Sequence, residues 1–467
     1  MALEQWVNLP KDDEFKDSDT KSKLRMGAVT VKVSFKKASF QIFRVRAILQ
    51  DADPEYSPSE QGRNANFKMR TSPLISNWGQ ANVDVETEVP LLAAGGCKYT
   101  FEAMSATKVV SCSTEVVARR KLWYQAMAMK GVAMGGGCDK MEAEFWKPDK
   151  NYYIKIERVG GRTNLPFKKT VDASDGDQKN AIYNDMGSNY QMKKKDPYAF
   201  AIAFLNYVAR SEIITEPGHT TSFQPGKFSG DVSWTVTTSK YLWCDLDDAD
   251  DTNKSWFRSG TLRYLYSTPD GTKYTSLALS KSMVEVGSGK DFAEGGRKKI
   301  KIKIPKSFVD TCKTKGSTGT LRVSFRLRVV KKFLGGFSAG SLNAVIMATK
   351  AWWAPKNVEA LAPTIVHEVG HKVGMTARGT GLYPDTHGKH YTGQGHQGNH
   401  CSKGATYNAA SGWSGTPGCT MFGATSIGSK KAPIEFCDLC EPHIQKLDLA
   451  KDALVAGGFA MSLALYS

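Results

Sequence analysis

Two histidines in the C-terminal part of the chain constrain its fold more than any other feature. Residues 367–371 read His-Glu-Val-Gly-His, so His367 and His371 are four positions apart. On an α-helix this spacing places both imidazoles on one face, one turn apart, where they can bind the same metal ion. Glu368 follows the first histidine and leans toward the same ion, where it can accept a proton from water. The segment therefore predicts a helix that carries part of a metal site.

The residues around this segment support a helix over 361–376. Its buried side consists of four aliphatic residues, Ile365, Val366, Val369 and Val373. Pro363 lies near the expected start, where proline is tolerated. Gly374 follows the second histidine by three residues.

Histidine and cysteine, the residue types that most often bind transition metals, are concentrated from position 367 onward. This part of the chain contains seven of the eight histidines and four of the nine cysteines. The histidines that follow the helix are His387, His390, His396, His400 and His443, and the cysteines are Cys401, Cys419, Cys437 and Cys440. The four cysteines include a Cys-x-x-Cys pair. Without a signal peptide such a pair favours metal binding over two disulfides.

The order of these residues resembles the archaemetzincin family of metallopeptidases, whose signature runs HExxHxxGxxHC, then CxM, then CxxC. The resemblance covers about 365–440 and implies two zinc sites. The implied ligands of the catalytic zinc are His367, His371 and His400, with Glu368 as the general base. The implied ligands of a second, structural zinc are Cys401, Cys419, Cys437 and Cys440. Met421 would form the Met-turn beneath the catalytic site.

Two insertions distinguish the chain from that family. Residues 375–399 separate Gly374 from His400, where the family has two residues, and residues 402–418 separate Cys401 from Cys419, where it has about four. Both insertions are polar and rich in glycine, which predicts loops over the active-site cleft. The alternatives for the third ligand are three histidines and one carboxylate: His387, His390, His396 and Glu435.

The length of the chain predicts two or three domains. Apolar and polar residues alternate in the first part, as at 29–35, so we expect an N-terminal β-sandwich domain at 1–110. Residues 111–467 would form a metzincin-like zinc peptidase domain of the α+β class. A β-rich module at about 211–335 would be inserted into it.

Within the peptidase part, the local patterns predict two further helices and two strands. Strong helix formers predict a helix at 115–130, and a second helical pattern covers 338–351. Alternation predicts a strand at 152–159. The apolar run at 199–208 fits a buried strand better than a helix.

The chain has a formal net charge of +17, and its basic residues cluster. The runs at 297–306 and 321–330 each place alternate Lys or Arg residues on one strand face. If these strands paired, they would form a basic sheet face. The sequence nevertheless does not predict nucleic-acid binding, because no recognised motif or interleaved aromatic residues accompany the charges. The acidic run at 245–251 predicts a solvated loop, since it lacks the glycine and glutamate of an EF-hand.

The sequence contains no apolar run of about 18 residues, so no transmembrane segment is expected. It also begins without a basic segment followed by an apolar one, which predicts synthesis in the cytoplasm without a signal peptide. Any export would then need a non-classical bacterial route.

The resemblance implies a zinc-dependent endopeptidase acting on a protein or peptide substrate. The basic surface and the joined β-domain suggest a secreted bacterial effector or toxin, with a secretion-machine or carrier partner bound through the β-domains. The alternatives are a phage-tail or contractile-particle component with peptidase activity, and a catalytically inactive, zinc-stabilised binding protein.

Overall fold

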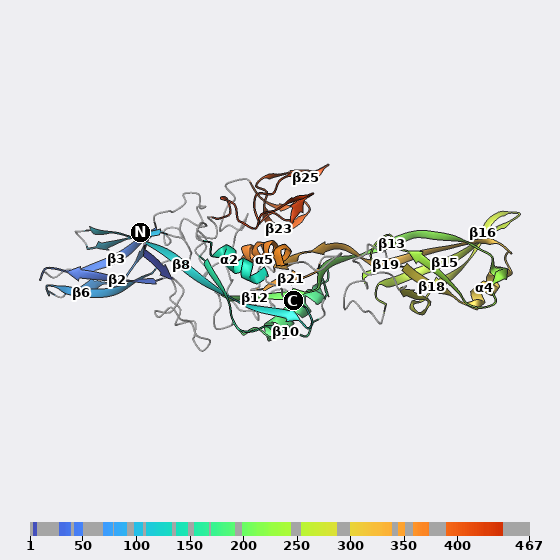
Figure 1. Ribbon diagram of the computed structural model, residues 1–467, viewed down its shortest axis with the longest axis horizontal. Coiled ribbons are helices and arrows are strands. Elements are labelled where there is room, and N and C mark those ends of the chain that lie inside the picture. Colours follow the sequence, from blue (N-terminus) through green and yellow to red (C-terminus); the bar gives the residue numbers. More distant parts are fainter. Residues whose placement is uncertain are drawn as a thin grey trace.

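The computed structural model describes sixteen stretches of the chain. They are residues 3–6, 28–38, 42–49, 69–77, 79–90, 98–105, 109–132, 137–147, 154–167, 170–191, 199–243, 254–286, 299–338, 344–350, 358–372 and 389–441. The fold is mixed, with more strand than helix and several separate sheets. Figure 1 shows an elongated molecule with an N-terminal β-lobe, a central part that contains α2 and α5, and a distal β-arm. None of the helices in these stretches has the length and hydrophobicity needed to cross a membrane.

An eleven-stranded sheet joins the N-terminal lobe to the central part. Its main path runs β20 (Gly336–Ser338), β21 (Ala344–Ala348), β12 (Ala199–Leu205), β8 (Val109–Met129), β7 (Lys98–Met104), β3 (Ile42–Leu49) and β4 (Met69–Thr71). Four short strands pair beside this path: β1 (Leu3–Trp6), β9 (Ile154–Arg158) and β10 (Thr163–Leu165) with β8, and β5 (Ile75–Ser76) with β3. The long strand β8 therefore runs through both parts, and the boundary predicted at residue 110 lies at its start.

The helix predicted at 115–130 is wrong, because residues 115–129 belong to β8. Residues 122–129 are buried without interruption, and β12 pairs with them in parallel. A strand buried on both faces has no alternation, so its alanines, methionines and leucines look helical in sequence, and tertiary pairing overrides that propensity.

A second helix prediction, at 338–351, is also wrong for the described residues. This range contains the end of β20 and the fully buried strand β21. Both faces of β21 are also buried, so its sequence lacks the alternation of apolar and polar residues that would indicate a strand. The strand predictions at 152–159 and 199–208 are confirmed by β9 and by β12 with the start of β13 (Tyr207–Phe223).

The N-terminal lobe adds a two-stranded antiparallel sheet, β2 (Ala28–Phe35) with β6 (Val83–Pro90). The strand predicted at 29–35 is β2. Its inward residues Val31, Val33 and Phe35 pack on the same hydrophobic core as the central sheet.

Three helices belong to the central part: α2 (Gly137–Phe145), α3 (Gly176–Ser188) and α5 (Val358–Lys372). The predicted helix with the two histidines is α5, although it begins at residue 358, so Pro363 lies inside it and removes one backbone hydrogen bond. α2 approaches α5 closely. A Cβ atom on Gly137 would lie 2.9 Å from Ile365 Cδ1, so only glycine fits there without movement.

The distal arm has a hydrophobic core of its own, with residues from 207 to 333. Its five-stranded sheet has the order β11 (Thr170–Asp172), β13, β19 (Gly319–Leu334), β15 (Phe257–Thr268) and β16 (Gly271–Leu279). Its three-stranded sheet has the order β14 (Val232–Thr237), β18 (Lys299–Ile304) and β17 (Val284–Val286). The remaining elements are α4 (Lys306–Lys313) and the 3₁₀ helices η3 (Pro225–Lys227) and η5 (Lys281–Met283).

The two basic runs do not pair with each other, so the single basic sheet face that their pairing would give is not formed. The first run contributes β18 and the second contributes β19, and these strands lie in different sheets. The apolar faces of both strands pack into the shared core of the arm, so their charged faces point away from each other. The arm therefore has two separate basic faces. The acidic run at 245–251 lies outside the described residues.

Asp172, at the end of β11, lies where the arm's five-stranded sheet meets the central part, because its neighbour Val171 packs in the central core. Arg328 of β19 donates to its carboxylate over 2.6 Å, and the backbone N–H of Ser211 donates over 3.1 Å. The guanidinium of Arg328 also stacks over the ring of Trp243, 4.6 Å from its centroid. Asp172 is only 1% exposed.

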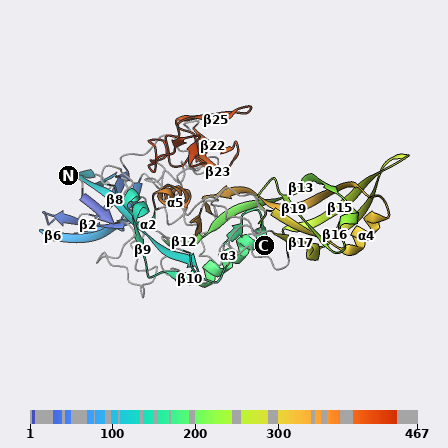
Figure 2. The ribbon, with the colours of Figure 1, turned by 45° about the vertical axis from the view of Figure 1, so that its right-hand side comes forward.

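A cap of short hairpins follows α5 in the chain. Its strands are β22 (His390–Gly393), β23 (His396–Cys401), β24 (Ala405–Asn408), β25 (Gly412–Gly415), β26 (Ser426–Ile427) and β27 (Lys430–Lys431). Figure 2 shows the cap on the same side of α5 as Figure 1 does. The described parts of the two predicted insertions therefore form hairpins. These hairpins lie beside α5, the helix that carries the two histidines.

Candidate metal centres

Helix α5 presents His367 and His371 from successive turns, as the spacing predicted. Their Nε2 atoms lie 3.1 Å apart. The Nδ1 atom of His367 lies 2.7 Å from the carbonyl oxygen of Thr420. Because a carbonyl only accepts, Nδ1 carries the proton, and Nε2 keeps its lone pair for a metal.

His400 completes the group from the end of β23. Its ring centroid lies 5.3 Å from that of His367 and 5.2 Å from that of His371. One ligand nitrogen from each of the three residues falls within 4.8 Å of the others. The structure therefore brings together the three histidines named as the implied ligands of the first site.

The other described alternatives for the third ligand are not part of this group and contact other residues. His390 contacts Cys440, His396 stacks on Trp413, and the carboxylate of Glu435 pairs with Lys147 at 3.0 Å. His387, Gly374 and His443 lie outside the described residues.

The histidine group fits a zinc ion. Tetrahedral zinc with ligand bonds of about 2.0–2.1 Å separates its nitrogens by about 3.3 Å, close to the spacing of the Nε2 atoms. Metal coordination also requires neutral imidazoles. Burial lowers the pKa of His367 against the opposing effect of the Thr420 carbonyl, and this favours the neutral ring.

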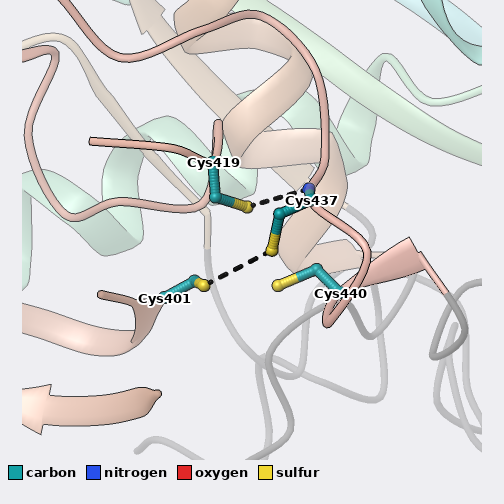
Figure 3. Close-up of side chains that lie close together, drawn as sticks. All are labelled: Cys401, Cys419, Cys437 and Cys440. Carbon is teal, nitrogen blue, oxygen red and sulfur yellow. Dashed lines mark hydrogen bonds between the residues drawn. The ribbon is translucent and has the colours of Figure 1, made fainter. Parts of the chain in front are cut away.

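Four buried cysteines form a second group (Figure 3). Their sulfur atoms, from Cys401, Cys419, Cys437 and Cys440, lie within 4.8 Å of one another and can hold a metal ion such as zinc. The Cys401 and Cys437 sulfurs are 3.7 Å apart, which matches the edge of a zinc tetrahedron with bonds of about 2.3 Å and is far beyond a disulfide of about 2.05 Å. Hydrogen bonds from Cys419 and the other two thiols hold the pKa of Cys401 well below its usual range, which favours its thiolate form.

One short segment, residues 419–421, contacts both groups. Cys419 belongs to the sulfur cluster, the Thr420 carbonyl accepts from His367, and the Met421 carbonyl accepts from the backbone N–H of Cys401 over 2.8 Å. Residues 419–421 therefore connect the two groups directly. Displacement of this segment would disturb both.

Met421 is fully buried beneath α5. A Cβ atom on Gly370 would lie 2.5 Å from its sulfur and 2.9 Å from the ring of Phe436. Gly370 thus lets the histidine helix rest directly on Met421. Glu368, on the same helix, is 8% exposed.

An aromatic cluster beside the histidines was missed by sequence reasoning. Trp413 stacks on His396 with ring centroids 5.6 Å apart, and its Nε1 donates to the Gln394 carbonyl over 3.0 Å. Tyr391 bonds to His396 Nδ1 at 2.5 Å, and its ring centroid lies 5.7 Å from that of His400. These contacts join the β22–β23 hairpin to β25. The available signal was the presence of tryptophan and tyrosine in insertions otherwise rich in glycine.

No protein-family model matches this chain, and the curated proteins compared with it give no match either. The functional interpretation of the two groups therefore depends on their geometry and on the chemistry of their candidate metal-ligand atoms.

Proposed function

We propose that the chain is a zinc-dependent endopeptidase with a metzincin-like catalytic domain, in which His367, His371 and His400 hold the catalytic zinc. The observation that carries this proposal is the convergence of three imidazoles from α5 and β23, with a glutamate next to the first of them. Three protein ligands are typical of catalytic zinc sites, because they leave a coordination position open for water or substrate.

Each residue of the site has a defined task in this proposal. The zinc would supply Lewis acidity, which polarises a peptide carbonyl and acidifies water. The carboxylate of Glu368 accepts a proton from that water and later delivers it to the leaving amine nitrogen. Thr420 keeps His367 in the tautomer that exposes Nε2. Met421 supports the helix from below.

The four cysteines would hold a structural zinc, since four thiolates form a closed tetrahedral site. Cys401 is bonded directly to His400 in the chain, so the second metal fixes the end of the strand that carries the third catalytic ligand. This anchor compensates for the insertion of residues 375–399 ahead of His400.

The edge of the central sheet supports an extended peptide as substrate. β20 is the end strand of the described path, pairs with β21 alone among the described strands, and contacts α5. An open strand edge can add a peptide by main-chain hydrogen bonds. A protein segment bound there would pass close to the histidine helix.

Glu368→Gln tests the mechanism because it keeps the shape of the side chain and removes its basicity. We expect the zinc content to stay the same and the cleavage of an unfolded protein substrate to fall by about 10²- to 10⁴-fold, the usual range for a general base. Glu285→Gln is the matched control, since Glu285 is exposed on β17 in the arm. Unchanged turnover in Glu368→Gln would exclude this mechanism.

For the biological setting we propose a bacterial effector or toxin delivered by a secretion or contractile machine. The N-terminal lobe and the arm extend away from the metal centres along the long axis (Figure 1), where they are available to a carrier. Expression in a target cell and in the periplasm tests this setting. Toxicity of the wild type and none with Glu368→Gln would support it, and a harmless wild type in both compartments would refute it. A phage-tail or particle component, or an inactive binding protein, would be the remaining alternatives.

A further inference from the structure

His390 occupies a position that the two proposed sites leave unexplained. It lies in the first insertion, at the start of β22, and is only 2% exposed. Its Nε2 atom is 3.3 Å from the sulfur of Cys440. In the hairpin register it faces Cys401, the cysteine that follows the third catalytic histidine. A buried imidazole therefore contacts the sulfur cluster from a segment that the cluster itself does not require.

The geometry distinguishes a hydrogen-bond donor from a fifth ligand. The group of donors that lie within 4.8 Å of one another contains the four cysteines and leaves His390 out. A tetrahedral zinc has only four positions, and the thiolates fill them. The separation of 3.3 Å fits an N–H···S hydrogen bond to Cys440, in which Nε2 carries the proton.

We propose that His390 is a positioning residue for the second metal site, and that its Nε2–H stabilises the Cys440 thiolate by donating to it. This inference rests on the proposed structural zinc. It assigns a role in holding that metal to the described part of the 375–399 insertion, which contains His390. The insertion also precedes His400 in the chain.

Charge explains why the site needs such a donor. Four thiolates around one Zn²⁺ leave a net charge of −2 in a buried environment, and buried charge is costly unless hydrogen bonds satisfy it. The backbone N–H of Cys437 donates to Cys419 over 3.4 Å. His390 supplies a corresponding donor to Cys440, and it does so from outside the cysteine loops.

The same contact also fixes the hairpin that serves the catalytic site. β22 and β23 pair His390 with Cys401 and Tyr391 with His400. Attachment of His390 to Cys440 therefore holds the strand opposite both residues. Loss of the contact should weaken the second site first and loosen His400 as a consequence.

Two substitutions in the full-length protein separate the hydrogen bond from simple packing. His390→Leu removes the donor and keeps the site filled, whereas His390→Gln keeps an N–H group at a similar distance. Competition with a chelator measures the zinc affinity of each variant. We expect about a 10- to 100-fold loss at the second site in His390→Leu, the usual effect of removing a partner of a metal ligand, and recovery to within a few-fold of wild type in His390→Gln.

His396→Leu is the matched control, because His396 lies on the same hairpin and bonds to Tyr391 rather than to a thiol. It should leave the affinity of the second site within a few-fold of wild type. Equal affinity in His390→Leu and wild type would overturn the inference.

Cobalt substitution tests whether His390 is itself a ligand. The sulfur-to-cobalt absorption of the wild type should correspond to four thiolates and should keep its intensity in His390→Leu. An intensity that corresponds to three thiolates in the wild type would make His390 a ligand and overturn the inference. A wild type that binds only one metal ion would instead refute the proposed second site.

Discussion

His367 and Thr420 are linked by a hydrogen bond of 2.7 Å between the imidazole Nδ1 and the backbone carbonyl. The bond joins the first histidine of α5 to a segment whose neighbouring residue, Cys419, belongs to the sulfur cluster. On the other side of Thr420, Met421 accepts from the backbone N–H of Cys401. The two candidate metal sites are therefore connected through one three-residue segment, and changes in either should be measurable in the other.

The first prediction concerns metal content. Wild-type protein purified with zinc should contain two zinc ions per chain by mass spectrometry, because two separate donor groups are preformed. His367→Ala should contain one, since two histidines alone hold zinc weakly. Cys312→Ser is the control, because Cys312 is a buried cysteine in the core of the arm, away from both groups. One zinc in the wild type would contradict the two-site arrangement.

The second prediction concerns the order of metal loss. A closed site of four thiolates holds zinc more tightly than a site of three imidazoles with an open position. Titration with a chelator should therefore remove the histidine-bound zinc first, and peptidase activity should disappear at that stage and return when zinc is added. Removal of the second zinc should then lower the melting temperature, because it releases the cap. Activity that persists until the second zinc leaves would contradict this order.

The third prediction concerns Gly370. In Gly370→Ala the new methyl group would meet Met421 and Phe436, both buried, so α5 must shift on its support. We expect a loss of about 1–3 kcal/mol in the free energy of unfolding, as for other overpacked cores. Gly176→Ala is the control, since Gly176 begins helix α3 and has open space around it. Denaturant unfolding of both variants measures the difference, and equal stability would show that the core below α5 can adjust.

The two groups of candidate metal ligands were predictable because the chemistry of a metal site fixes the spacing of its ligands. His367 and His371 need a helix to meet, and the buried aliphatic residues around them allow one. The choice of His400 over its neighbours depended on its adjacency to Cys401, and the structure places it in the group. Sequence could not assign His390, because only the cross-strand register brings it to Cys440.

The central sheet was less predictable for a physical reason. Residues 122–129 of β8 and the whole of β21 are buried on both faces, so they carry no alternation that reveals them, and both were predicted as helices. The direction of the basic faces in the arm also depends on which sheet each strand joins. Lys301 and Arg326 occupy similar patterns in sequence but lie on opposite sides of one core.

The fourth prediction concerns the connection between the arm and the central part, where Asp172 is buried. Burial raises the pKa of Asp172, but hydrogen bonds from Ser211 and Arg328 outweigh it, so the pKa of the folded protein lies below the ordinary value. A carboxyl group with a lowered pKa stabilises the fold above its unfolded pKa of about 3.9 and loses that contribution as the pH falls through the folded value. The stability that this pair provides should therefore be complete near neutral pH and decline only below about pH 4.

Asp172→Asn tests this connection at two pH values. Near pH 7 the variant should lose about 3–5 kcal/mol, because it leaves Arg328 buried without its main partner, and Asp175 at 4.0 Å should keep the loss near the lower limit. Below about pH 4 the difference from wild type should shrink, since both proteins then lack the charge at this position. Asp270→Asn, which removes an exposed carboxylate between β15 and β16, should show no measurable pH-dependent difference. Urea unfolding of the three proteins at matched zinc occupancy provides the measurement. A difference that stays constant with pH would mean that Asp172 acts through packing alone.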